Sequence, residues 1–274
     1  MKVVVLGANG MLGHDLVNTF KNYELCSFSK KELDITNKAL VNKKIKSIKP
    51  VFVINAAAYT DVDGSESNLD LAYAVNAEGV KNIADSCKKN NCIVIHISSD
   101  YVFDGNKNGY KEDDKPNPMN IYGRSKYMGE KYLKQVNPQH YLIRTSWLYG
   151  LKGKNFVYAI LDLAKKQKEI EVVDDQSGSP TCTKDLSWSI KYIVDRKPDF
   201  GIYHRTNNGI CTWFDFAKKI IELKNLKVKI KPITSNRLKR AAKRPRCSVL
   251  INTKLPKLRH WEEALKDFLC GEIN

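Results

Sequence analysis

Long apolar runs are missing from this 274-residue chain. No stretch approaches the ~18 consecutive apolar residues of a membrane span, which excludes a transmembrane protein and leaves no membrane partner to expect. The first apolar run, Val3–Leu6, is interrupted at Gly7 after the length of a strand, so we expect no signal peptide. A chain of this length buries a full core and forms one large domain or two unequal ones.

Cysteine patterns that cross-link a chain or bind a metal are also missing. The chain has seven cysteines, an odd number, and no two of them form a CxxC pair. We therefore expect reduced thiols in a cytoplasmic protein rather than a disulfide framework. No cluster of His, Cys and acidic residues has the spacing of metal ligands, and we predict no catalytic metal.

One segment lacks acidic residues and has almost no aromatic ones. Between Leu223 and Trp261 there are thirteen Lys or Arg residues and no Asp or Glu, so the net charge of +16 is unevenly distributed. Such a segment binds nucleic acid, holds a small polyanion such as a nucleotide diphosphate, or forms a solvated face. Nucleic acid is disfavoured because base stacking needs aromatic side chains. Arginines beside the rigid Pro245 favour the site for a small anion.

Three glycines follow the first apolar run at the spacing GxxGxxG, at Gly7, Gly10 and Gly13. In a strand–turn–helix unit the first glycine permits the tight turn, and the second lets the backbone approach a pyrophosphate. The third lets the helix pack on the strand, and the helix N-terminus supplies amide donors and a partial positive charge. The turn predicts a dinucleotide site, and a purely structural turn is the alternative.

Short β-rich runs alternate with helical stretches in the first half of the chain. The expected strands are Val3–Leu6, Tyr23–Phe28, Val51–Asn55, Cys92–Ser98 and Tyr141–Thr145. The expected helices are His14–Lys21, Lys38–Ile48, Leu69–Asn90 and Ile121–Gln135. Apolar strands separated by helices predict an α/β fold of the Rossmann type, a doubly wound parallel sheet with helices on both faces.

The regular alternation stops near Gly150. Beyond it we expect helices at 156–166, 185–194 and 214–223, the last capped by Thr212, and a short strand at 171–173. We therefore divide the chain into a dinucleotide-binding domain, residues 1–150, and a smaller C-terminal α/β domain, residues 151–274. We expect the second domain to bind mainly substrate. We also expect some of its helices or strands to pack as part of the first domain.

Tyr122 and Lys126 lie four residues apart at the start of an expected helix, so their side chains share one face. A free Tyr hydroxyl has a pKa near ~10, and a neighbouring ammonium favours its ionised form. Such a pair suits delivery of a proton to the alkoxide that forms when a hydride attacks a ketone. Ser99 ends an expected strand, where α/β active sites lie, and can hydrogen-bond the same oxygen. Taken alone, the pair is also compatible with two surface residues.

Together these motifs resemble the extended short-chain dehydrogenase/reductases, and among them the dTDP-4-dehydrorhamnose reductases. The glycine spacing is typical of that superfamily, and the resemblance runs over nearly the whole chain. The more specific stretches are SSDYVFDG at 98–105, RTSWLYG at 144–150, DQSGSPT at 175–181 and the Arg244-Pro245 pair.

The resemblance implies a place in dTDP-rhamnose and other carbohydrate biosynthesis. The implied reaction is reduction at C4 of a nucleotide-linked 4-keto-6-deoxyhexose, converting dTDP-4-dehydro-L-rhamnose to dTDP-L-rhamnose. It assigns Tyr122 as the proton donor, Lys126 as the group that holds the nicotinamide ribose and lowers the pKa of Tyr122, and Ser99 as the residue that orients the ketone. The implied substrate contacts are Asp100, Trp147, Gln176 and Arg244.

The resemblance also places the cofactor along the glycine turn and the following strand ends. Besides Tyr122 and Lys126, the implied contacts are Gly7, Asn9, Gly10, Met11, Leu12, Ser29, Lys30, Asp34, Ile35, Ala57, Ala58, Tyr59 and Asn76. The second strand runs into Ser29-Lys30-Lys31, without the acidic residue that binds a free ribose 2′-hydroxyl and repels a 2′-phosphate. We therefore predict NADPH, with NADH as the alternative cofactor.

Three departures from the family pattern leave the sugar and the nucleotide open. Ser99 replaces the usual Thr, Asp61 and Gly64 interrupt a run beside the expected sugar site, and Lys243 precedes Arg244. The alternatives are a 4-ketoreductase for a UDP- or GDP-linked sugar, including a heptose, and a non-catalytic regulatory subunit of the methionine adenosyltransferase type. A dehydratase is disfavoured but stays open because Asp100 lies beside Ser99. The expected partner is a nucleotide sugar rather than nucleic acid, and a homodimer stays open.

Overall fold

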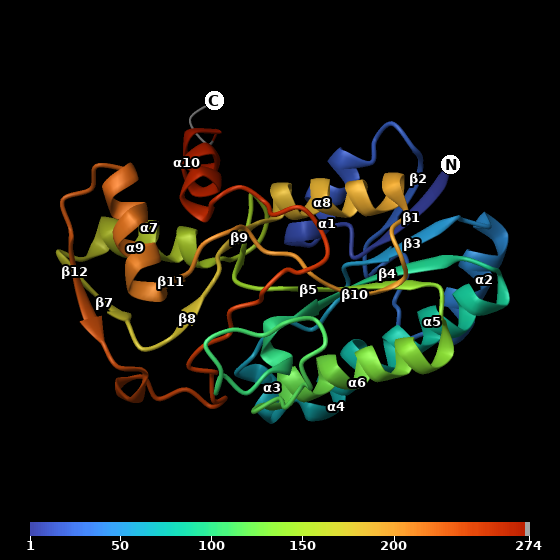
Figure 1. Ribbon diagram of the computed structural model, residues 1–274, viewed down its shortest axis with the longest axis horizontal. Helices are drawn as coiled ribbons and strands as arrows, with labels where there is room; N and C mark the ends of the chain where they lie inside the picture. Colours follow the sequence, from blue (N-terminus) through green and yellow to red (C-terminus); the bar gives the residue numbers. More distant parts are fainter. Residues whose placement is uncertain (272–274) are drawn as a thin grey trace.

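A computed structural model describes residues 1–271 of the protein. Two lobes lie side by side, a larger one around a six-stranded sheet and a smaller one around short strand pairs and helices (Figure 1). All seven cysteines lie within the described residues and are free thiols. Among the helices of residues 1–271, none is both long and apolar enough to cross a membrane.

Six parallel strands form the central sheet, in the order β2-β1-β3-β4-β5-β10. They are β1 (Lys2–Leu6), β2 (Glu24–Phe28), β3 (Phe52–Asn55), β4 (Ile93–Ser99), β5 (His140–Thr145) and β10 (Gly201–His204). From β1 the chain first moves outward to β2 and then returns to the other side of β1 for β3. Ligands of such sheets bind beyond the carboxyl ends of the strands at this switch point. The predicted Rossmann-type parallel sheet is confirmed.

Helices cover both faces of this sheet (Figure 1). One face carries α1 (Met11–Thr19) and α8 (Thr183–Arg196), and the other carries α2 (Lys38–Ile48), α5 (Gly79–Lys89) and α6 (Ile121–Val136). Along β1, Val3 and Val5 pack in the first layer, whereas Val4 and Leu6 pack in the second. Because both faces are buried, the strand is a continuous apolar run rather than an alternating one.

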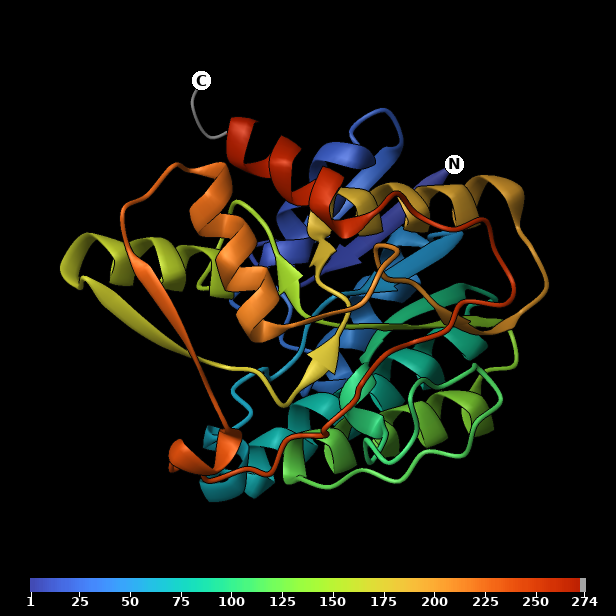
Figure 2. The same cartoon turned by 60° about the vertical axis from the view of Figure 1, so that its left-hand side comes forward.

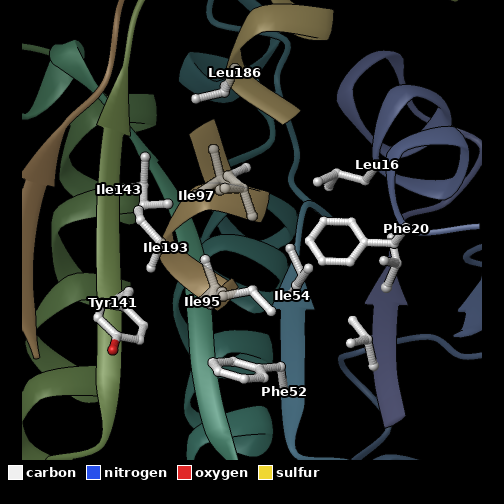
Figure 3. Packing of buried hydrophobic residues seen from close by; sticks show 14 of the residues in the cluster. Leu16, Phe20, Phe52, Ile54, Ile95, Ile97, Tyr141, Ile143, Leu186 and Ile193 are labelled. Atoms are coloured by element: carbon white, nitrogen blue, oxygen red, sulfur yellow. The ribbon is translucent and has the colours of Figure 1, made fainter. Parts of the chain in front are cut away.

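Figure 3 shows the first of these layers from close by. Leu16 of α1, Phe20 directly after this helix and Leu186 of α8 lie toward strand residues such as Ile54 and Ile97. Since α8 follows Gly150 in sequence, the core of the larger lobe includes a segment from the second half of the chain. The same holds for β10, which the sequence analysis did not predict and which pairs with β5. The division at residue 150 stays a prediction about function.

The helix expected over residues 69–90 is interrupted by a π-helical turn. It consists of α4 (Leu69–Tyr73), the turn η1 (Ala74–Glu78) and α5, and the short α3 (Gly64–Ser67) precedes it. π turns inside helices are frequent at functional sites. Here the turn aims Asn76 inward, where Nδ2 donates to the Tyr59 carbonyl (3.0 Å) and to the Ser125 hydroxyl (3.0 Å). Oδ1 of Asn76 accepts from the Tyr59 amide at 2.9 Å.

The smaller lobe contains three helices and a parallel strand pair. These elements are α7 (Phe156–Lys166), β7 (Glu169–Val173), α9 (Trp213–Leu223), β12 (Lys229–Ile233) and α10 (Trp261–Gly271). Two further pairs of two-residue strands lie between the lobes, β6 (Leu148–Tyr149) with β9 (Thr181–Cys182) and β8 (Ser177–Gly178) with β11 (Cys211–Thr212). Thr212 caps α9 as expected, in a reciprocal capping box with Asp215.

Replacing Ile190 by Ala tests whether α8 is part of the larger lobe's core. Ile190 is fully buried, and removing its methyl and methylene groups leaves a cavity under the sheet. We expect the free energy of unfolding, measured in urea, to fall by about 2–5 kcal/mol. Ile210→Ala is the matched control, because Ile210 is 60% exposed and its loss is expected to cost less than about 0.5 kcal/mol. Equal losses in the two variants would contradict this placement of α8.

Candidate active site

The glycine turn lies at the switch point of the sheet, where β1 and β3 end side by side. Gly7 has φ of +80°, and a Cβ there would lie 2.7 Å from the amide nitrogen of Ala57. A Cβ on Gly13 would lie 2.0 Å from the Gly7 carbonyl oxygen. A Cβ on Gly10 would approach only that oxygen, at 3.2 Å. The turn is therefore open on its outer side at the second glycine. The helix α1 begins at Met11, three residues earlier than expected, and its N-terminus therefore faces the turn.

A groove runs from this turn across the ends of β1, β2 and β3. It is lined by Gly7, Asn9, Gly10, Lys30, Leu33, Asp34, Ile35, Ala56, Ala57, Ala58 and Val75. Eight of these are predicted cofactor contacts: Gly7, Asn9, Gly10, Lys30, Asp34, Ile35, Ala57 and Ala58. Small side chains at the turn and an apolar wall suit a pyrophosphate and a flat heteroaromatic ring. The residues present therefore fit a dinucleotide.

The other predicted cofactor residues lie around this groove without lining it. The Met11 side chain extends toward Gly150, where an added Cβ would be 3.2 Å from Met11 Cγ. Leu12 is 5% exposed and packs in the core, which leaves only its backbone for a ligand. Tyr59 is held by both ends of the Asn76 amide, so this pair shapes the wall after β3.

Ser29 has an acidic partner that the sequence analysis overlooked. Oε2 of Glu32 accepts hydrogen bonds from the Ser29 amide (2.8 Å) and the Ser29 hydroxyl (2.7 Å). These bonds hold the pKa of Glu32 below its ordinary value. The chain turns back after Lys31, with the amides of Glu32 and Leu33 bonded to the Ser29 carbonyl. Residues 29–31 themselves contain no acidic side chain, as the sequence analysis states, but the Glu32 carboxylate lies beside Ser29.

Ser99, Tyr122 and Lys126 come together at the carboxyl end of β4. Asn120 caps the helix α6, and its Oδ1 accepts from the Gly123 amide at 2.7 Å. A Cβ on Gly123 would lie 2.1 Å from the Tyr101 carbonyl oxygen, so this glycine lets the helix approach the strand end. The three predicted catalytic residues are all buried, with exposures of 8%, 9% and 2% for Ser99, Tyr122 and Lys126.

Burial controls the acid–base properties of these groups. It raises the pKa of Tyr122 well above the ordinary value, and the Ser99 hydroxyl acts in the opposite direction. Burial also lowers the pKa of Lys126 to about 8. The expectation that Lys126 lowers the pKa of Tyr122 is not met in this structure. Burial dominates, and Nζ of Lys126 donates to the Ile97 carbonyl at 2.6 Å. Tyr122 therefore stays protonated at neutral pH, as a proton donor must.

A buried ion pair lies one helical turn beyond Lys126, and the sequence analysis missed it. Arg144 donates through Nε to Oε1 of Glu130 (2.9 Å) and through Nη2 to Oε2 (2.7 Å). The Ser98 hydroxyl donates to Oε1 at 2.6 Å. Both charged side chains are at most 1% exposed. The signal in the sequence was the spacing, since Glu130 follows Lys126 by four residues and shares its face.

Asp100 and Tyr101 lie beside the predicted catalytic residues, in the 3-10 turn η2 (Asp100–Val102). Asp100 is 2% exposed and accepts from the Ser99 hydroxyl at 2.9 Å. Burial raises its pKa to about 6, while the hydroxyls of Ser248 and Ser99 act against the rise. The Tyr101 ring is edge-on to the Tyr122 ring, with centroids 5.6 Å apart. Tyr101, which the sequence analysis did not name separately, is therefore a neighbour of the predicted proton donor.

Trp147 lies where the two lobes meet. Its φ is +48°, a left-handed conformation that bulky residues rarely adopt. Its indole stacks on that of Trp213, with centroids 3.5 Å apart and an interplanar angle of 7°. A Cβ on Gly178 would lie 2.4 Å from Cε2 of Trp147, so the Gly178 backbone covers part of the ring. The predicted contact Gln176 is buried two residues before Gly178.

Arg244 forms an ion pair with Asp63, which lies in the first half of the chain. Nη1 and Nη2 donate to the two carboxylate oxygens of Asp63 at 2.5 and 2.6 Å. This bidentate bond is the main cause that lowers the pKa of Asp63 to about 2. Nearby, Nδ2 of the Asn120 side chain donates to the Lys243 carbonyl oxygen at 2.7 Å. The basic segment, orange to red in Figure 2, is thereby held against the start of α6.

The sequence model of the family described as "RmlD substrate binding domain" matches residues 1–272. The chain belongs to this family. The curated dTDP-4-dehydrorhamnose reductase of Aggregatibacter actinomycetemcomitans is 39% identical over 97% of each chain. The spore coat polysaccharide biosynthesis protein SpsK of Bacillus subtilis is also 39% identical, over 98% of this chain and 96% of its own.

A solved RmlD relative has the same fold. The crystal structure of dTDP-4-dehydrorhamnose reductase from Bacillus anthracis in complex with NADP superimposes with a TM-score of 0.96 at 40% identity. The match covers 98% of this chain and 99% of that one. Within residues 1–271 no three His, Cys, Asp or Glu side chains are grouped so as to hold a metal ion.

Replacing Asp100 by Asn tests how this buried carboxyl titrates. A carboxyl that binds its proton more tightly in the folded state destabilises the fold as the pH rises from about 4 to above 6. A pKa of about 6 in place of 3.8 corresponds to about 3 kcal/mol. We expect Asp100→Asn to be more stable than the parent at about pH 7.5, and the gain to vanish near pH 4.

Thermal and urea unfolding at several pH values measure this difference. Asp113→Asn is the control, because Asp113 is exposed and its replacement is expected to change stability equally at both pH values. A gain for Asp100→Asn that does not depend on pH would contradict the titration.

Proposed function

We propose that this chain reduces the C4 ketone of dTDP-4-dehydro-L-rhamnose with NADPH and releases dTDP-L-rhamnose. The observation that carries the proposal is the convergence of Ser99, Tyr122 and Lys126 at the end of β4, in the lobe whose neighbouring strand ends form a groove with a lining that fits a dinucleotide. Two full-length relatives at 39% and 37% identity are named dTDP-4-dehydrorhamnose reductase, and the solved relative holds NADP.

The bound reduced nicotinamide supplies the hydride. The chain supplies the proton, because the raised pKa of Tyr122 keeps its hydroxyl protonated until negative charge develops on the ketone oxygen. Ser99 donates a second hydrogen bond to that oxygen and orients it. Lys126 holds the nicotinamide ribose, as the resemblance implies, and Glu130, one helical turn away, favours the charged form of its ammonium group. No metal-dependent step is needed for this reaction.

The substrate side of the site is assigned by position. Asp100 and Tyr101 lie beside the reacting groups, and Trp147 and Gln176 lie where the lobes meet. Arg244 acts as a positioning residue, since its guanidinium is already bound by Asp63. The diphosphate is held instead by exposed cations of the same segment. Among these, Arg240 lies close enough to act on the pKa values of Asp63 and Tyr101.

Removing the Tyr122 hydroxyl tests the chemistry. We expect Tyr122→Phe to lower kcat with dTDP-4-dehydro-L-rhamnose by about 10²–10⁴-fold, because the ketone oxygen loses its proton donor. The loss of NADPH absorbance measures kcat, and NADPH binding itself is expected to stay within about threefold of the parent. Tyr132→Phe is the matched control on the same helix, since Tyr132 contacts Lys81 and lies outside the site.

The same assay separates the alternatives. Turnover of Tyr122→Phe equal to the parent would refute the mechanism. Preference of the parent for UDP- or GDP-linked 4-keto sugars would change the substrate but not the chemistry. No turnover of any 4-keto sugar nucleotide would favour the regulatory-subunit alternative.

Replacing Arg244 by Lys tests the positioning role. Lysine keeps the charge but loses the two parallel bonds to Asp63, so the basic segment is no longer held against α6. We expect KM for the sugar nucleotide to rise about tenfold or more, while kcat falls by less than about tenfold. Arg196→Lys on the outer face of α8 is the control. A fall in kcat with unchanged KM would contradict this role.

A cytoplasmic location and a homodimer stay proposals. The seven free thiols agree with a reducing compartment. Cell fractionation tests the first, and light scattering of the purified chain tests the second.

A further inference from the structure

We infer that Glu32 is a specificity-determining residue for the cofactor, and that its carboxylate opposes dinucleotides that carry a 2′-phosphate. The inference rests on the proposed function only for the use of a nicotinamide dinucleotide. It concerns the end of β2, which lies outside the reacting groups at β4.

Glu32 lies in the turn after β2, between the groove residues Lys30 and Asp34. In doubly wound sheets the group that recognises the ribose 2′-position lies at the end of the second strand. Here that end is Phe28, and the turn that follows contributes Lys30 and Asp34 to the groove. Glu32 belongs to the same turn, and its carboxylate accepts a hydrogen bond from the amide of Ser29, the first residue of that turn.

Both donors of Ser29 are occupied by this carboxylate. A 2′-phosphate at the strand end would draw on the Ser29 amide and hydroxyl, and these already donate to Oε2 of Glu32 at 2.8 and 2.7 Å. A phosphate that binds here must displace Glu32 or lie beside it. Ser29 is 8% exposed, so few other partners reach its side chain.

The charges around this point have opposite effects on the two cofactors. A phosphate monoester carries about −1.5 to −2 charges at pH 7, which Glu32 repels and Lys30 attracts. Lys44 also faces Glu32 and helps to keep it ionised, and Asp34 adds a second negative charge to the turn. A free 2′-hydroxyl instead can donate to a carboxylate. Glu32 therefore weakens the binding of NADP(H) and strengthens the binding of NAD(H). Lys30 has the opposite effect on the two cofactors.

The test compares binding of NADP⁺ and NAD⁺ to the full chain by isothermal titration calorimetry, without any sugar. Glu32→Gln keeps an oxygen acceptor for Ser29 but removes the charge. We expect its Kd for NADP⁺ to fall about three- to tenfold and its Kd for NAD⁺ to stay equal or rise. The gain is expected to shrink between about 0.05 and 0.5 M salt, as screening predicts.

Glu24→Gln is the matched control at the opposite end of the same strand. Glu24 pairs with Lys2 at 3.0 Å and lies at the amino end of β2, away from the groove. We expect it to leave the ratio of the two Kd values unchanged, although it alters the net charge equally. The same ratio in Glu32→Gln and Glu24→Gln would overturn the inference.

Two other outcomes also decide against the inference. If Glu32→Gln weakens NADP⁺ and NAD⁺ alike, Glu32 only shapes the turn, and melting temperatures would show whether the turn is lost. If Glu32→Gln weakens NADP⁺ alone, the sign of the effect is wrong. Because the readout is binding without sugar, a failure of ketone reduction leaves the result interpretable and distinguishes the two proposals.

Discussion

Arg144 and Glu130 form a bidentate ion pair that water does not reach, and three elements of the active site depend on it. Arg144 belongs to β5 and Glu130 to α6, and the Ser98 hydroxyl brings in the end of β4. Leaving either buried charge alone costs about 3–5 kcal/mol, so these elements keep one relative position. Ser99 follows Ser98, and Lys126 lies one turn before Glu130, so this contact sets the distance between them.

The second constraint joins the two halves of the chain. Asp63 and Arg244 are 181 residues apart in sequence and are bound through two parallel hydrogen bonds. The pair brings the basic segment to the start of α6, while α8 and β10 return from the second half to the larger lobe. The proposed substrate side of the site therefore draws on both halves of the chain, and the larger lobe contains elements of both.

Much of the fold could be predicted because burial leaves a strong pattern. The strands of the sheet are buried on both faces and are apolar without alternation, and the bounds predicted for α2 and α7 agree with the structure. Less could be predicted where pairing is short or local preference is weak. The strand β10 has four residues, and β12 lies in the lysine-rich segment, where only pairing with β7 makes it a strand. The π turn that aims Asn76 inward left no periodicity to detect.

The sequence by itself determined the sheet, the glycine turn and the placement of Tyr122 and Lys126 on one helix face, because each of these depends on local spacing. Only the tertiary structure decided which charged groups are free. In the folded chain Arg244 is bound to Asp63, and the Glu32 carboxylate accepts from the Ser29 hydroxyl. Tyr122 is buried so deeply that its pKa rises. These outcomes depend on which side chains meet and how far water is excluded, and neither is written in the spacing of residues along the chain.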